Sequence, residues 1–282
     1  MEIINAHVHM IEIKKVMLKM AISDVPAGIT MFDNLQGTLS LLNIDALFSQ
    51  MDEAGITKSV LFGCDAPILY SSNEYVTALC KKYPERLIGF ASVDPKRKDA
   101  ATIIGGAIKK LGLRGIKFHP PLQNFYPNDE NVFPIYETAM ALKVPIAFHV
   151  GSTPFGSLVR LDQANPILLD EVACKFPRLK VILTHLGTLW SDEAFMVVEK
   201  NPNVYVDTAA YVYEIPQLLT VETVARLGPK KLIFGTDYPT PFGGRTHKMK
   251  DFVEAVQDLK LPKDVIEGIF FNNFQELLGG KI

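Results

Sequence analysis

The stretch PIAFHVG, residues 145–151, is a short apolar run that ends beside a histidine. Similar short runs, rich in β-branched residues, recur along the chain, and longer amphipathic segments separate them. Each run is apolar throughout rather than alternating, which indicates a parallel sheet whose outer face is covered by helices. Eight such units of about 33 residues each predict an α/β fold of the (β/α)₈ TIM-barrel type. The predicted strands are residues 2–9, 58–63, 86–93, 114–120, 145–151, 180–187, 203–208 and 231–239.

The segments between the strands carry helix start and stop signals. Asn43 can cap a helix over 44–54 that ends at Gly55. No Pro- or Gly-rich linker divides the chain, so residues 1–282 are predicted to form a single domain. The connection 10–42 is unusually long and apolar, which suggests a lid, a subunit contact or an extra core-packing segment. Other expected helices are 73–83, 99–111, 166–176, 217–227, 251–259 and roughly 264–278.

Composition narrows the class of protein. The chain has 282 residues, a net charge of −2 and three cysteines that form no CxxC pair. A nucleic-acid or anionic membrane partner is therefore not expected, and neither is a disulfide framework. No signal peptide and no apolar run long enough to span a bilayer is recognisable. We expect a cytoplasmic protein that acts on a small molecule.

Polar residues with metal-binding chemistry gather at the ends of the predicted strands. Five of the six histidines lie there, and an aspartate has the equivalent place on the last strand. In a barrel these carboxyl ends meet at one rim, where active sites are built. Imidazole and carboxylate groups suit Zn²⁺ and similar ions, which activate water. The sequence thus predicts a metal site at this rim, in which His7, His9, one further histidine and Asp237 supply the ligands and a remaining histidine can move protons.

The chain resembles the amidohydrolase-related family (amidohydrolase family 2) of the amidohydrolase superfamily, which contains decarboxylases and many predicted hydrolases. NAHVH (5–9), FHVG (148–151), THLG (184–187) and GTDYP (235–239) carry the resemblance. It implies one divalent metal ion, with Zn²⁺ as the first choice, held by His7, His9, His149 and Asp237. The resemblance also implies that His185 is a catalytic acid/base, and that Asp237 helps to deprotonate an attacking water. The apolar connection 10–42 and the family's habit suggest a homodimer.

The chain departs from the family at Asn5, because members often carry aspartate there. An asparagine supplies no charge to the metal ligands, so we expect a labile metal. Lys117 stands where binuclear members of the superfamily have a carboxylated lysine that bridges two ions. We interpret it instead as a supporting residue or a contact for a substrate anion, with the metal bridge as the alternative. Further candidate substrate contacts are His119, Arg160, Trp190 and Arg245.

Hydrolysis of an amide, ester or lactone and decarboxylation of a small acid both fit such a site. We favour hydrolysis, because the connection 10–42 contains lysines but no arginine to hold a departing carboxylate. Two other classes are disfavoured. A TatD-like nuclease would require an acidic ligand on strand three or four, where only Asp94 is available, and a non-catalytic barrel would be expected to have lost metal ligands.

Overall fold

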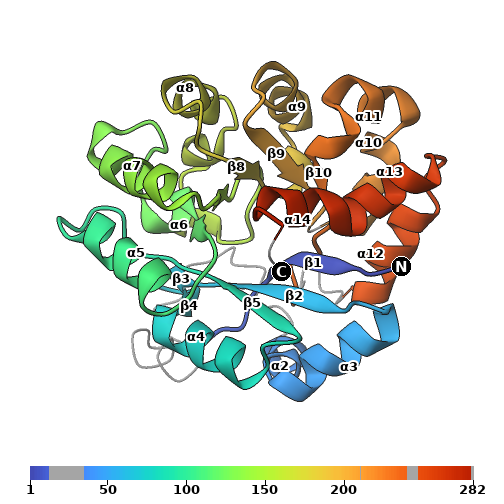
Figure 1. Cartoon of the computed structure of the whole chain (residues 1–282), viewed down its shortest axis with the longest axis horizontal. Coiled ribbons are helices and arrows are strands. Elements are labelled where there is room, and N and C mark those ends of the chain that lie inside the picture. Colours follow the sequence, from blue (N-terminus) through green and yellow to red (C-terminus); the bar gives the residue numbers. More distant parts are fainter. Residues whose placement is uncertain (13–34, 210, 240–246, 281–282) are drawn as a thin grey trace.

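Eight parallel strands form a closed barrel, as the sequence predicts. The computed structural model describes residues 1–12, 35–209, 211–239 and 247–280 (Figure 1). Hydrogen-bonded neighbours run in the order β1-β2-β5 and β6-β7-β8-β9-β10. Parallel bridges between Ala91 and Ile116 and between Val8 and Tyr238 join the two groups. The barrel strands are β1 (Ile4–Val8), β2 (Lys58–Phe62), β5 (Leu87–Phe90), β6 (Ile116–Phe118), β7 (Ile146–Phe148), β8 (Val181–Leu183), β9 (Val204–Asp207) and β10 (Leu232–Ile233). A short antiparallel hairpin, β3 (Cys64–Asp65) and β4 (Tyr70–Ser71), follows β2.

The seven helices predicted from sequence signals are all present. Asn43 caps its helix by accepting a hydrogen bond from the Ala46 amide at 2.9 Å, and Gly55 ends it with φ 68°. The seven predicted helices correspond to α3 (Ile44–Ala54), α4 (Asn73–Lys82), α5 (Ala100–Lys109), α8 (Leu168–Lys175), α10 (Ile215–Leu218) with α11 (Val221–Leu227), α12 (Met249–Gln257), and α13 (Lys263–Glu267) continuing through a π-helical turn into α14 (Asn273–Leu277).

Two longer helices were not predicted, α7 (Phe133–Leu142) and α9 (Ser191–Lys200). Each lacks one of the usual signals: α7 ends at Lys143 in a left-handed conformation without a glycine, and α9 follows Trp190 with no side-chain cap. Shorter helices are α2 (Leu35–Leu41), inside the long connection, and α6 (Pro120–Gln123). Most of the predicted lid or subunit contact, residues 13–34, lies outside the described residues.

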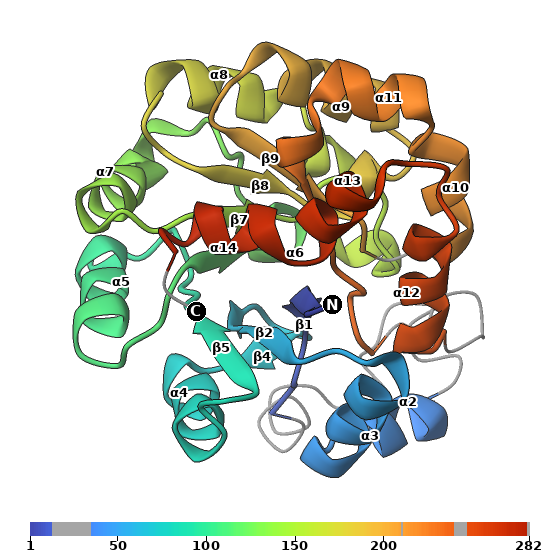
Figure 2. The same ribbon diagram turned by 45° about the vertical axis from the view of Figure 1, so that its right-hand side comes forward.

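The barrel interior is apolar at the N-terminal end of the strands and polar at the other end. Apolar side chains from six strands fill the N-terminal part of the barrel interior together with Phe274 and Leu277 of α14. Figure 2 shows α14 running across the strands beside the start of β1. Because this helix covers the N-terminal end, the functional residues face the opposite rim. Within the described ranges, no helix combines the length and apolar character that a membrane span requires.

Candidate metal centre

His7, His9 and Asp237 bring three ligand atoms together at the carboxyl ends of the first and last barrel strands. The Nε2 atoms of His7 and His9 are 3.2 Å apart, as expected for residues two apart on one strand. Asp237 Oδ1 lies 3.1 Å from His7 Nε2 and 3.4 Å from His9 Nε2. The Asp237 amide donates to the His7 carbonyl at 3.0 Å, and its φ of 58° is unusual for a residue with a side chain. The fold thus holds this carboxylate in a strained conformation beside both imidazoles.

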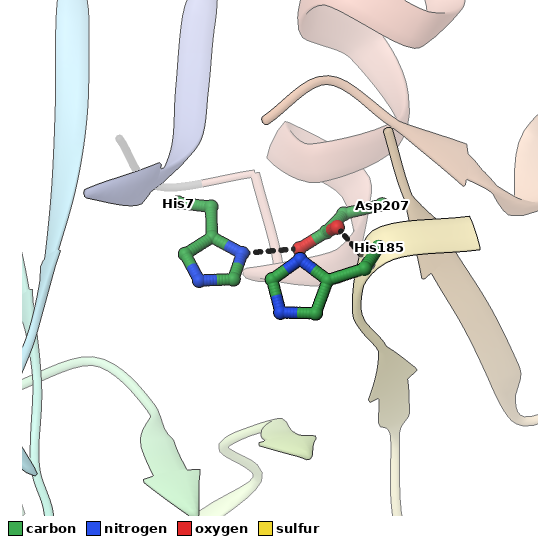
Figure 3. A group of neighbouring side chains, drawn as sticks. All are labelled: His7, His185 and Asp207. Carbon is green, nitrogen blue, oxygen red and sulfur yellow. Dashed lines mark hydrogen bonds and ion pairs between the residues drawn. The ribbon is translucent and has the colours of Figure 1, made fainter. Parts of the chain in front are cut away.

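A second carboxylate, Asp207 at the end of β9, fixes the orientation of His7. Its Oδ2 accepts from His7 Nδ1 at 2.8 Å (Figure 3). Its Oδ1 accepts from the backbone amides of His185 at 2.7 Å and Ala209 at 3.1 Å. Asp207 was not predicted as a site residue, although it lies within the predicted strand 203–208 and ends the observed strand β9.

These contacts decide which ring nitrogen of His7 can bind a metal. A neutral imidazole carries one ring proton, and in His7 the hydrogen bond to the Asp207 carboxylate keeps this proton on Nδ1. His7 Nε2 then turns a lone pair towards His9 and Asp237. Ligand atoms of one four-coordinate zinc ion at about 2.0–2.1 Å lie roughly 3.3 Å apart. The observed separations of 3.1–3.4 Å therefore fit three ligands of a single divalent ion. His7, His185 and Asp207 also lie close enough to hold an ion, but Asp207 is already satisfied by its hydrogen bonds.

His149 and His185 form a second pair beside this cluster. His185 begins the turn His185–Gly187 after β8 with φ 66°, and its Nε2 lies 3.0 Å from Nδ1 of His149. His149 stands apart from the three-atom cluster, yet its Nε2 is buried without a hydrogen-bond partner in the described structure. If His149 donates from Nδ1, its Nε2 keeps a lone pair for a metal and the proton of His185 is on Nδ1, which is also unpartnered.

The protonation states suit a divalent cation. Burial lowers the pKa of His9 to about 4 and that of His149 to about 3. Burial acts to raise the pKa of Asp237, but electrostatic attraction and hydrogen bonding by His7, with a hydrogen bond from His9, hold this pKa well below its usual range. Near pH 7, His9 and His149 are therefore neutral imidazoles and Asp237 is an ionised carboxylate, and these are the forms that bind metals.

Asn5 has a different task from the one expected. Its Oδ1 accepts from the Thr236 amide at 3.0 Å and its Nδ2 donates to Thr236 Oγ1 at 2.8 Å, so it fastens β1 to the segment that precedes Asp237. Asn5 itself supplies no charge, as expected, but Asp207 provides a carboxylate to His7 from β9. The labile metal stays a prediction.

Lys117 lies on β6, and His119 comes directly after this strand. The His119 ring stacks on His149 with centroids 3.9 Å apart, and its Nδ1 accepts from the Leu122 amide at 3.3 Å. Lys117 is only 1% exposed, and none of the residues that the structure describes forms a hydrogen bond with its Nζ. Burial lowers the pKa of Lys117 to about 8.

The two remaining candidates for substrate contacts lie at the surface or near it. The Arg160 guanidinium is exposed and pairs with Asp162 at 2.6 Å. Trp190 is half-buried at the start of α9. Their roles stay predictions, and Arg245 lies outside the described residues.

A family model described as Amidohydrolase matches residues 4–280, and the chain therefore belongs to this family of enzymes. A relative from Dictyostelium discoideum, a 2-amino-3-carboxymuconate-6-semialdehyde decarboxylase, is 24% identical over 69% of this chain and 64% of its own length. A γ-resorcylate decarboxylase from Polaromonas sp. is 24% identical over 67% of this chain and 74% of its own length. The chain thus spans less than two thirds of the Dictyostelium relative.

Among solved structures, a dihydroxybenzoic acid decarboxylase from Polaromonas sp., with bound manganese and the inhibitor 2-nitroresorcinol, matches with a TM-score of 0.76. Its sequence is 19% identical, over 99% of this chain and 97% of that one. This likeness confirms the barrel fold.

The preference for hydrolysis is wrong, because these relatives are decarboxylases. The absence of arginine from the connection 10–42 does not exclude decarboxylation, because a cation on another element can bind a substrate carboxylate.

Proposed function

We propose that the chain is a metal-dependent decarboxylase of a small aromatic carboxylic acid, one that carries a hydroxyl group next to the carboxylate. The observation that carries this proposal is the convergence of His7 Nε2, His9 Nε2 and Asp237 Oδ1 within 3.1–3.4 Å at the barrel rim. The decarboxylase names of both curated relatives support the choice of reaction.

His7, His9 and Asp237 would hold the metal ion, with His149 Nε2 as a further ligand. Zinc and manganese both suit nitrogen and oxygen ligands, and manganese is the ion bound in the Polaromonas structure. When bound, a divalent ion draws electron density from oxygen atoms of the acid and so favours breakage of the bond to the carboxylate.

The side chains contribute the proton balance of the reaction. Decarboxylation breaks one C–C bond, releases CO₂ and requires one proton at the carbon left behind. His185 is placed to deliver it, because its Nδ1 is buried and unpartnered while its Nε2 faces His149. Asp207 accepts from the His185 backbone and holds the turn in place. A positioned histidine of this kind is a common general acid.

CO₂ release from a panel of hydroxybenzoates tests the proposal. We expect release by protein reconstituted with Mn²⁺ or Zn²⁺, loss after chelation, and recovery when the ion is restored. His185→Gln should retain the metal and lose at least a hundredfold in kcat. Metal-loaded protein that releases no CO₂ from any of these acids would contradict the proposal. A cytoplasmic location and a homodimer remain predictions.

A further inference from the structure

Lys117 places a buried, unpartnered ammonium group inside the barrel. Its neighbours Ile116 and Phe118 pack into the core between strands and helices, so the alternation along β6 turns Lys117 inwards. The residue is 1% exposed, and no hydrogen-bond partner of Nζ lies in the described part of the chain. A buried lysine without a partner is rare, because an unpaired charge loses its hydration.

Nearby carboxylates attract the charged form of Lys117, but none of the described residues accepts a hydrogen bond from its Nζ. Its Nζ lies 4.8 Å from the centre of the Phe62 ring, which also contacts the rings of His7 and His9. Asp207 and Asp237 attract the ammonium electrostatically, but neither bonds to it. On the neighbouring strand β7, the residue in register with Lys117 is Ala147, whose side chain is small. Within the described ranges, the three N–H donors of this ammonium therefore form no hydrogen bond.

We propose that the Lys117 ammonium binds the carboxylate of the substrate. This inference rests on the proposed function and names the cation that holds the acid. A carboxylate accepts hydrogen bonds from an ammonium strongly, because both groups are charged. The buried position strengthens the attraction relative to a surface lysine. Arg160 is a poorer candidate, because Asp162 already occupies its guanidinium at 2.6 Å.

The competing role for Lys117 is a carboxylated side chain that bridges two metal ions. A carbamate on Nζ would place a third negative group near Asp207 and Asp237, and a second cation would be required to balance it. The anion-binding role requires one ion and a protonated amine. Metal content therefore separates the two roles.

The test compares benzoate with benzamide, two ligands of the same shape that differ in charge. Equilibrium binding to the Mn²⁺-loaded protein is measured by calorimetry at pH 7 for the wild type, Lys117→Met and Lys117→Gln. Lys98→Met, which removes an exposed lysine, is the matched control. We expect both Lys117 variants to bind benzoate 10- to 100-fold more weakly and benzamide within twofold of the wild type. The control should bind both ligands as the wild type does.

Several results would overturn the proposal. These are unchanged benzoate binding in both variants, an equal loss for benzoate and benzamide, no benzoate binding to the wild type, or about two ions per chain falling to one in the variants. A thermal unfolding curve identifies a variant that fails to fold, and the other variant then decides. Binding requires no turnover, so a protein that discriminates benzoate through Lys117 but decarboxylates no acid would refute the proposed function alone.

Discussion

Replacing Asp207 with asparagine tests the arrangement of the centre, because the substitution changes charge but hardly changes shape. The carboxylate accepts from His7 Nδ1 at 2.8 Å and from two backbone amides. In Asp207→Asn, the amide oxygen can satisfy the two backbone donors, and the NH₂ group then faces His7. That arrangement moves the ring proton of His7 to Nε2, which blocks the lone pair intended for the metal.

The opposite orientation of the asparagine amide is no better, because its NH₂ group would then face two backbone donors. Either way the site loses about one buried hydrogen bond to a charged group, worth roughly 1.5–3 kcal/mol. This range corresponds to a loss of about 10- to 100-fold in metal affinity, the usual effect of removing such a supporting group.

Competition for Mn²⁺ or Zn²⁺ against a chromogenic chelator at pH 7 measures the loss. Asp170→Asn is the control, because the Asp170 carboxylate bonds to Lys200 and Asn201 away from the centre. Nitrogen-15 NMR of the histidine side chains reports which nitrogen of His7 carries the proton. Metal binding by Asp207→Asn within twofold of the wild type would show that the tautomer argument is mistaken.

Three further results are expected. Asp237→Ala should lose most bound metal and essentially all activity, whereas His185→Ala should keep the metal, as measured by elemental analysis; an empty site in the latter would make His185 a ligand. Benzoate affinity of the wild type should be full well below pH 8 and fall as the pH rises past it, because deprotonation of Lys117, pKa about 8, removes the positive charge. Calorimetric titrations at several pH values check this against Lys117→Met, which should lack the decline. The charged and titratable groups that interact with Lys117 are Asp207, Asp237, Cys64, His9, His119, His149 and His185. Phe274→Ala should cost about 3–5 kcal/mol in urea unfolding, because the side chain is buried in the barrel floor; a cost below 1 kcal/mol would contradict that packing.

The barrel could be predicted from the sequence because its strands are mostly apolar and most of the helices between them have recognisable ends. The pairing of His7 with His9 was equally accessible, since it depends only on the two-residue period of a strand. The individual strands and helices and the histidine pair are local features, so a single segment of sequence determines each of them.

The supporting contacts could not be predicted, because they join residues far apart in the chain. Asp207 meets His7 only when β9 and β1 lie in the same barrel. Asn5 looked like a lost carboxylate because its partner, Thr236, is more than 200 residues away. In the same way, the lack of a hydrogen-bond partner for Lys117 Nζ among the described residues depends on several strands that pack around it.

The seam that closes the barrel has a consequence for the order in which the protein is made. β1 meets the segment after β10 through the Val8–Tyr238 bridge and the Asn5–Thr236 contacts, and the same seam joins His7 and His9 to Asp237. The ribosome produces the two histidines long before the aspartate, because β1 precedes the other barrel strands in the chain. A nascent chain therefore carries half of a metal site that has nothing to close it. All three ligands can hold the ion only after Asp237 has been synthesised.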